Sequence, residues 1–146
     1  MTKVHELLDA KGRSIWTVAP ETSVFDALQL MSEKQIGAVL VVESRKLVGV
    51  FSERDYARKI VLKGKSSKSA TVQEMMTKRI FFVSPEETLA TCMKLMTAQH
   101  VRHLPVLDGD RLVGIITIGD VVKQVISDQQ FTIDELTKYI TGDGYV

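Results

Sequence analysis

Two short stretches of the chain place a hydroxyl side chain and a carboxylate at the same spacing. Ser52 precedes Asp55 by three residues, and Thr117 precedes Asp120 by three residues. In each stretch an apolar run containing glycine ends at the hydroxyl residue, and a helical pattern follows. Backbone N–H groups point outward where a helix begins, and they bind anions such as phosphate. A carboxylate only accepts hydrogen bonds, so it suits the two adjacent hydroxyls of a ribose. The pattern therefore predicts a nucleoside-phosphate site at each junction.

Helix capping is the alternative interpretation of the same residues. A Ser or Thr at a helix start accepts a backbone hydrogen bond, and the helix dipole favours an acid in the first turn. For a single copy of the pattern this interpretation is the simpler one. Two features favour binding sites. The pattern occurs twice, 65 residues apart, and Gly119 lets a ligand approach the backbone closely at the second junction.

The remaining reactive side chains do not form a catalytic or metal site. His100 and His103 have the spacing of two metal ligands, but no third ligand is close in the sequence. Cys92 is the only cysteine, and its helical position corresponds to Ala27, 65 residues upstream, which predicts a small buried side chain. No nucleophile or general base stands beside a partner group, so we do not expect an enzyme.

The chain contains an internal repeat. A shift of 65 residues places residues 15–62 on residues 80–127 without a gap. Further upstream, residues 4–8 resemble residues 72–76 at a shift of 68. The first copy therefore carries three extra residues in its loop at 9–14. Repetition over this length indicates two equivalent structural units.

Each copy predicts the same order of elements. Apolar residues at i, i+3, i+4 and i+7 indicate a one-faced helix after Ser23 and after Thr88, which stand where N-caps are expected. Short β-branched runs around polar turns indicate two strands. The predicted elements are helical turns at 4–8 and 72–76, extended segments at 15–18 and 80–83, helices from 24 and 89, strands at 38–42, 47–51, 104–107 and 112–116, and final helices at 55–62 and 120–126.

These elements predict an α/β (α+β) fold of two βαββα repeats. A unit this small leaves a sheet face and a helix face uncovered, so the copies should pack on each other about a pseudo-twofold axis. We divide the chain into residues 1–67, 68–129 and 130–146, the last comprising a C-terminal helix and a tail.

Two further segments lie outside the repeated elements. The lysine-rich connector at 63–69 is interpreted as a solvated linker, in preference to a phosphate or nucleic-acid patch, because no aromatic residues interleave with its charges. Thr132 and Glu135 have the spacing of a capping box, which predicts the start of a short helix that runs to about residue 139. The tail at 141–146 is expected to fray.

Composition excludes several classes of protein. The chain has 146 residues, 45% of them hydrophobic and 25% charged, with a net charge of +1. This balance is typical of a globular domain and gives no bulk attraction to nucleic acid or membrane. No apolar run approaches the roughly 18 residues of a membrane span, and the N-terminus is not that of a signal peptide. With a single cysteine, a cytoplasmic location is expected.

The paired copies resemble two CBS domains forming a Bateman module. The resemblance covers residues 4–126 and rests on the Gly-apolar-apolar-Ser/Thr-x-x-Asp element in both copies. The strand entry His-Leu-Pro-Val at 103–106 adds to it. It implies a homodimer of such pairs. It also implies two clefts per chain that bind adenine nucleotides such as AMP, ADP, ATP or NAD.

The resemblance assigns one set of residues to the cleft of the second junction. Thr117 would contact phosphate, Asp120 the ribose, and Arg102 with His103 would reach the phosphate. The complete set is Ile15, Trp16, Thr17, Ile36, Gly37, Arg102, His103, Ile115, Thr117, Gly119 and Asp120.

A matching set belongs to the cleft of the first junction. Its members are Val50, Ser52, Arg54, Asp55, Ile80, Phe81 and Val101. The two clefts are not equivalent, because Gly37 and Ala38 stand where the other repeat has Arg102 and His103. We therefore expect the Asp120 cleft to be the better binder of a charged nucleotide, unless Arg54 substitutes in the Asp55 cleft. The Asp55 cleft is then weaker, empty or used by another part of a dinucleotide.

The functional expectation is a regulatory module in signal transduction. Nucleotide binding between the copies would alter the oligomer or the surface that meets an effector protein. The alternative is a structural subunit for dimerisation or interaction, whose ligand sites are vestigial.

Overall fold

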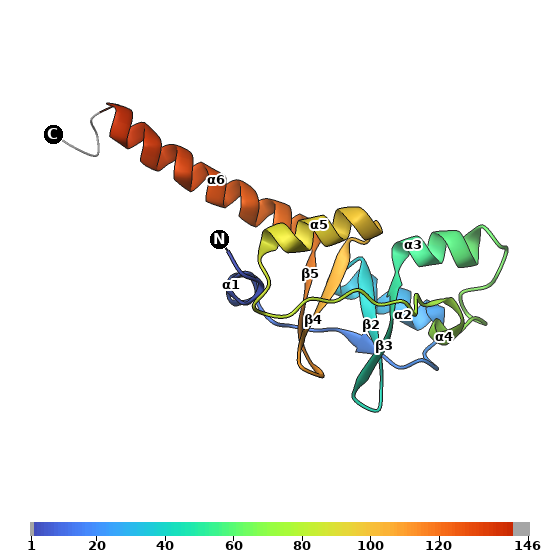
Figure 1. The fold of residues 1–146 in the computed structure, drawn as a ribbon. Coiled ribbons are helices and arrows are strands. Elements are labelled where there is room, and N and C mark those ends of the chain that lie inside the picture. Colours follow the sequence, from blue (N-terminus) through green and yellow to red (C-terminus); the bar gives the residue numbers. More distant parts are fainter. Residues whose placement is uncertain (1, 142–146) are drawn as a thin grey trace.

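The computed structural model describes residues 2–141. It has the mixed α/β fold that the sequence predicts, with a three-stranded and a two-stranded sheet side by side (Figure 1). The first repeat comprises α1 (Val4–Lys11), β1 (Thr17–Val18), α2 (Val24–Lys34), β2 (Ala38–Glu43), β3 (Lys46–Ser52), α3 (Glu53–Asp55) and the π-helical segment η1 (Tyr56–Val61). The second comprises α4 (Val72–Met75), α5 (Leu89–Gln99), β4 (His103–Asp108), β5 (Arg111–Thr117) and α6 (Ile118–Thr141).

The predicted N-caps are confirmed. The Ser23 side chain accepts a hydrogen bond from the Asp26 backbone at the start of α2, and Thr88 accepts one from Thr91 at the start of α5. Both hydroxyls satisfy a backbone N–H group that has no partner within its own helix.

The two sheets differ by one strand, and Pro105 explains the difference. In the first repeat β1 pairs in parallel with β2, and the Leu40 N–H donates to Trp16 O at 3.3 Å. The residue equivalent to Leu40 in the second repeat is Pro105, which has no N–H to donate. The second extended segment therefore forms only a single parallel bridge, between Val83 and Val106, in place of a strand.

Each repeat lends its leading helix to the core of the other. Val4, Leu7 and Leu8 of α1 pack in the core built on β4 and β5. Equivalent residues of α4 pack in the core built on β2 and β3. Backbone hydrogen bonds fix this exchange, since the Val4 N–H donates to Glu87 O at 2.8 Å and the Val72 N–H to Thr22 O at 2.8 Å. Neither core is complete without residues from the other half of the chain.

The C-terminal region corrects one prediction. The sequence predicted a separate helix beginning at Thr132, but α6 is one continuous helix from Ile118 to Thr141. Thr132 does not cap a helix start. Its Oγ1 donates to Asp128 O at 3.1 Å, a bond to the preceding turn that is compatible with a helix interior. The far half of α6 projects away from the rest of the molecule (Figure 1). The predicted fraying concerns 141–146, and residues 142–146 lie outside the described part. Within 2–141, no helix is long and apolar enough to cross a membrane.

Gly114 tests the helix exchange. A Cβ atom at this position would lie 2.8 Å from Leu8 Cδ2 on α1, in a core where Leu8 is fully buried. We expect Gly114→Ala to lower the free energy of unfolding by about 1–3 kcal/mol, because an overpacked core must shift its side chains or backbone. The measurement is equilibrium urea denaturation.

Gly119→Ala is the matched control. Its added Cβ meets nothing closer than Thr117 Oγ1 at 3.7 Å, within a helix that favours Ala over Gly. This variant should be as stable as the wild type or more so. Equal urea midpoints for Gly114→Ala and the wild type would contradict the packing described here.

Candidate functional site

Two adjoining cavities lie between the repeats. The larger has a volume of about 430 Å³ and contains the Ser52–Asp55 junction. The smaller, of about 360 Å³, contains the Thr117–Asp120 junction. Gly37, His103 and Thr117 line both, so these three residues form the boundary between the cavities. We refer to them as the shared wall.

The Asp55 carboxylate is occupied by the protein itself. Its Oδ2 accepts from the Ser52 backbone at 3.0 Å and from Ser52 Oγ at 3.1 Å. Its Oδ1 accepts from Thr77 Oγ1 at 3.0 Å and pairs with Lys59 Nζ at 3.2 Å. A carboxylate has about four acceptor positions. At this junction the acid caps the helix and bonds to neighbouring protein groups, as the capping interpretation predicts. Asp55 still borders the cavity.

The Asp120 carboxylate is only partly occupied. Its Oδ2 accepts from the Thr117 backbone at 3.1 Å and pairs with Lys11 Nζ at 2.7 Å. No hydrogen bond within the described residues reaches its Oδ1, and 28% of the side chain is exposed. Burial acts to raise the pKa of Asp120, but the bonds from Lys11 and Thr117 outweigh it and lower the pKa. Asp120 is therefore an ionised acceptor with one free oxygen.

His103 is the titratable group of the shared wall. Its Nε2 lies 3.4 Å from the position that a Cβ would take on Gly37, so the ring fills the space that this glycine leaves. Burial lowers the pKa of His103, and the positive charges of Arg102, Arg54 and Lys11 lower it further. The imidazole is neutral at pH 7 as a result.

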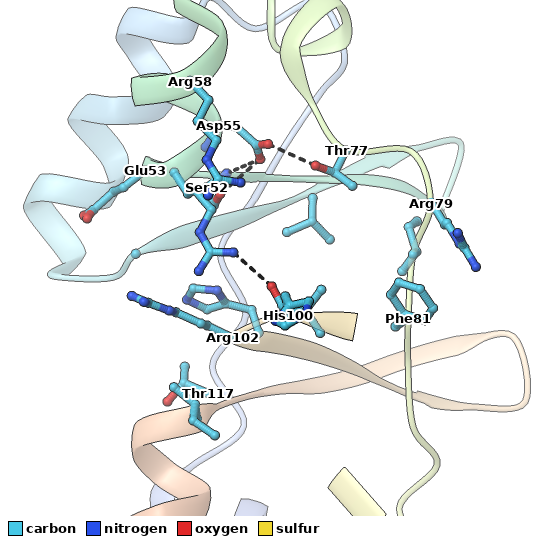
Figure 2. Close-up of a pocket in the computed structure, with 17 residues that line it drawn as sticks. Ser52, Glu53, Asp55, Arg58, Thr77, Arg79, Phe81, His100, Arg102 and Thr117 are labelled. Carbon is cyan, nitrogen blue, oxygen red and sulfur yellow. Dashed lines mark hydrogen bonds between the residues drawn. The ribbon is translucent and has the colours of Figure 1, made fainter. Parts of the chain in front are cut away.

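Four arginines border the larger cavity. Arg54 Nη1 donates to His100 O at 2.9 Å, and the Arg79 guanidinium stacks 5.1 Å from the centre of the Phe81 ring. The side chains of Arg58 and Arg102 form no hydrogen bond or ion pair with residues of the described chain. Figure 2 shows Ser52, Asp55 and Thr77 on one side of this cavity and Thr117 on the other, with the Arg102 side chain between them. The cavity therefore offers cationic groups that have no anionic partner.

The residues predicted for the first cleft lie together. All of them line the larger cavity: Val50, Ser52, Arg54, Asp55, Ile80, Phe81 and Val101. Whether they bind a ligand stays a prediction.

The residues predicted for the second cleft do not all line one cavity. The smaller cavity is lined by Trp16, Ile36, Gly37, His103, Ile115, Thr117 and Asp120, as predicted. Ile15, Thr17 and Gly119 do not line it. Successive side chains of an extended segment point to opposite sides, so Trp16 faces the cavity while its two neighbours do not.

Arg102 does not line the Asp120 cleft, and its predicted contact with the phosphate stays a prediction. Arg102 lines the larger cavity, while His103, the next residue, lines both. The same alternation along the chain explains why adjacent side chains diverge. The sequence-based ranking of the two clefts relied on Arg102 beside Asp120. The arginines that could serve the Asp120 cleft as phosphate partners instead lie on the other side of the shared wall.

Sequence reasoning missed several residues of the site. Lys11 lines the Asp120 cleft, and Thr77, Arg58 and Arg79 line the Asp55 cavity. The one available signal for Lys11 was the three-residue insertion at 9–14. The others come from segments whose approach depends on the helix exchange, which no local pattern reveals.

Two side chains outside the polar junctions have clear roles. Cys92 is fully buried, as predicted, and burial raises the pKa of its thiol to about 11, so it packs as a protonated side chain. Trp16 lies at the edge of the Asp120 cleft with Lys34 Nζ 4.3 Å from the centre of its ring. Among the described residues, no group of three or more His, Cys, Asp or Glu has an arrangement that holds a metal ion.

Known proteins share this architecture. Residues 9–62 and 72–127 each match the family model of the CBS domain. The mitochondrial CBS domain-containing protein CBSX3 of Arabidopsis thaliana is 36% identical over 154 residues, which cover 99% of this chain and 74% of that protein. A CBS-domain protein of Burkholderia ambifaria MC40-6 has a TM-score of 0.85 at 52% identity, over 90% of this chain and 99% of that one.

A more distant solved structure shares the fold. It is the CBS domain pair of protein MJ0100 in complex with 5-methylthioadenosine and S-adenosyl-L-methionine, with a TM-score of 0.77 at 23% identity. It covers 88% of this chain and 98% of that one. Because the CBS model matches both halves of the chain, and the solved relatives share its structure, the protein belongs to the CBS-domain family and contains two CBS domains in tandem.

Proposed function

We propose that this CBS pair is a regulatory module that binds an adenine nucleotide across the two adjoining cavities. One observation carries the proposal. A carboxylate with a free oxygen, Asp120 Oδ1, lies on one side of the shared wall, and arginines without anionic partners lie on the other. A ribose needs the first and a phosphate needs the second. The nucleotide class and the orientation described next are part of the proposal.

The nucleoside part fits the Asp120 cleft. Its lining is apolar around Trp16, Ile36 and Ile115, which suits the face of an adenine ring. Asp120 Oδ1 then accepts a hydrogen bond from a ribose hydroxyl at the N-terminus of α6. The Asp55 carboxylate is less suited to this role, because protein donors already fill its acceptor positions.

The phosphate part extends past His103 and Thr117 into the larger cavity. There Arg102 and Arg58 are available as charge-assisted donors, and Arg54 is held nearby by His100 O. The Asp120 cleft thus remains the preferred nucleotide site, with phosphate partners supplied from the neighbouring cavity. The apolar end of that cavity, around Ile80 and Phe81, is available to a further part of a dinucleotide such as NAD.

A ligand in this position touches both repeats, and this contact is the basis of regulation. A ligand at about 100 times its dissociation constant stabilises the bound arrangement by roughly 2.7 kcal/mol. That free energy suffices to change an oligomer or the surface offered to an effector protein. We propose no enzymatic step. A cytoplasmic location also remains a proposal, since the Arabidopsis relative is described as mitochondrial.

The proposal predicts a specific pattern of binding. Isothermal titration with AMP, ADP, ATP, NAD, S-adenosyl-L-methionine and 5-methylthioadenosine should identify at least one ligand. Asp120→Asn should weaken the binding of that ligand about tenfold or more, because it removes the charged acceptor of the ribose. Arg102→Ala should weaken the binding of phosphate-bearing ligands and leave the affinity for 5-methylthioadenosine unchanged. Asp108→Asn, at the exposed end of β4, is the matched control. If no compound binds at millimolar concentration, the proposal fails.

The pH dependence supplies an independent prediction. The pKa of free His103 is lowered by burial and by neighbouring cations, and a bound phosphate opposes those charges and raises it. Binding therefore takes up a proton, and the affinity for ATP should rise as the pH falls from about 7.5 to 5.5. The ATP affinity of His103→Gln should not show this rise at lower pH. The ratio of wild-type to variant affinity cancels the titration of the ligand's own phosphates. A ratio that is constant across this range would contradict the assignment of His103.

The alternative function, a dimerisation subunit, is favoured by α6. Apolar residues recur along this helix at alternating intervals of four and three, the repeat of a two-stranded coiled coil. Ile recurs every seventh residue, and the intermediate positions hold Val, Gln and Leu. The stripe consists of Val122, Ile126, Gln129, Ile133, Leu136 and Ile140, and its apolar members are exposed. The ion pair between Glu135 and Lys138 lies off this stripe, so two copies of α6 can meet without like charges between them. We propose a second copy of this chain as its partner.

This alternative has its own test. Ile133→Asp places a charge in the middle of the stripe and should convert a dimer to a monomer in light scattering coupled to size-exclusion chromatography. Phe131→Asp is the matched control. Phe131 is also exposed but lies off the stripe, so this variant should remain a dimer. If the wild type is monomeric, or Ile133→Asp remains dimeric, α6 does not hold the copies together.

A further inference from the structure

Lys11 makes two contacts at the Asp120 junction that no repeated motif predicts. It is the last residue of α1, and its ammonium lies 2.7 Å from Asp120 Oδ2. The same ammonium donates to the backbone oxygen of Ile115 at 2.8 Å. Both partners line the Asp120 cleft, as does Lys11 itself.

The equivalent contacts at the other junction come from Thr77. Its backbone N–H donates to Val50 O at 2.9 Å, and its Oγ1 donates to Asp55 Oδ1 at 3.0 Å. Val50 corresponds to Ile115 in the 65-residue repeat, and Asp55 corresponds to Asp120. The Lys11 ammonium therefore takes the place of two neutral donors of Thr77, at a junction whose counterpart also has the Lys59 ammonium 3.2 Å from Asp55 Oδ1.

The leading helices explain the replacement. The chain leaves α4 after Met75, so Thr77 is extended and pairs with Val50. In the first repeat α1 continues to Lys11, and within residues 2–141 no isolated β-bridge to Ile115 corresponds to the one between Thr77 and Val50. The three-residue insertion at 9–14 accommodates this extra turn of helix. Lys11, at the end of α1, then reaches Asp120 with its side chain. In the other repeat the extended residue Thr77 reaches Asp55.

Each acid pairs with one lysine, but only one of these lysines borders a cavity. Lys59 reaches Asp55 from the following helical segment and does not line the larger cavity, whereas Lys11 lines the Asp120 cleft. The position of Lys11 therefore changes what this cleft accepts. Oδ2 of Asp120 is used by Lys11 and by the Thr117 backbone, so a ribose has full access to Oδ1 alone. To contact both oxygens, a ribose must displace the ammonium. An uncharged nucleoside leaves that ammonium without an anionic partner, whereas a phosphate-bearing ligand supplies one. The charge of Lys11 contributes to the lowered pKa of His103, so the ammonium acts on the wall past which the phosphate extends.

We propose that Lys11 is the residue that makes the Asp120 cleft select phosphate-bearing nucleosides over uncharged ones. It does so by holding Asp120 until a ligand phosphate offers the ammonium a new partner. This inference rests on the proposed nucleotide function. It adds to that function a residue outside the repeated motif and a stated preference between ligand classes.

Adenosine and AMP are the probes, because they differ by a single phosphate. Dissociation constants for both are measured by isothermal titration on the wild type, Lys11→Met and Lys11→Arg. In Lys11→Met adenosine should bind more tightly and AMP less tightly, so that the preference for AMP falls about tenfold or more. Lys11→Arg keeps the cation and should keep the preference. Lys94→Met removes one exposed positive charge from α5 and should also keep it.

A second measurement does not depend on any ligand. The pKa of the Asp120 carboxyl group, followed by carbon-detected NMR, should rise in Lys11→Met and stay low in Lys11→Arg. A thermal melt of each variant reports whether it is folded. An unchanged pKa in a folded Lys11→Met protein overturns the ion pair on which the inference rests.

The outcomes separate this inference from the proposed function. If the wild type binds AMP and Lys11→Met keeps the full preference, the inference is overturned and the nucleotide function stands. If the wild type binds neither probe but Lys11→Met binds adenosine, Lys11 blocks the cleft without selecting a phosphate, and the inference is overturned. If neither protein binds either probe, the inference is also overturned. In both cases the nucleotide function is decided by the remaining ligands of the binding series.

Discussion

The packing of each leading helix over a glycine of the opposite repeat is the constraint on which this structure depends. Leu8 of α1 covers Gly114 on β5, and Met76 next to α4 covers Gly49 on β3. A side chain at either glycine would hold the helix away from the sheet. Because the two halves complete each other's cores, they cannot separate without exposing both. The cavities between them are therefore a consequence of how the cores are closed.

The same exchange makes the two cavities unequal. Both leading helices end beside a strand–helix junction, but α1 ends one turn later than α4. At one junction the acid meets the Thr77 hydroxyl and the ammonium of Lys59, and at the other it meets the ammonium of Lys11 from the opposite repeat's side of the cleft. The arginines gather in the larger cavity, whose acid is filled by protein donors. The free acceptor oxygen lies in the smaller one. Acceptor and cations are separated only by the shared wall of Gly37, His103 and Thr117.

His103 links the two sides of that wall. It is buried enough to be neutral, and it is surrounded by cations from three different segments of the chain, Arg102, Arg54 and Lys11. Asp120 already opposes these cations, and an anion placed there would reduce the net positive charge around the imidazole further. In the proposed function, proton uptake, phosphate binding and the contact between the repeats therefore act on one side chain. A regulatory module needs coupling of this kind, because a ligand changes an equilibrium only through groups that differ between its states.

The repeat, the order of elements, the N-caps of α2 and α5, and the hydroxyl and acid at each junction could all be predicted from the residues alone. These features depend on patterns within short segments of the chain. Three others could not be predicted in this way: Arg102 faces the Asp55 cavity, Lys11 pairs with Asp120, and α6 is a single helix through Thr132. The first two depend on which side an extended residue faces and on where a helix of the other repeat ends. The third depends on a continuous helix outweighing a local capping signal, so none of the three was present in any short segment.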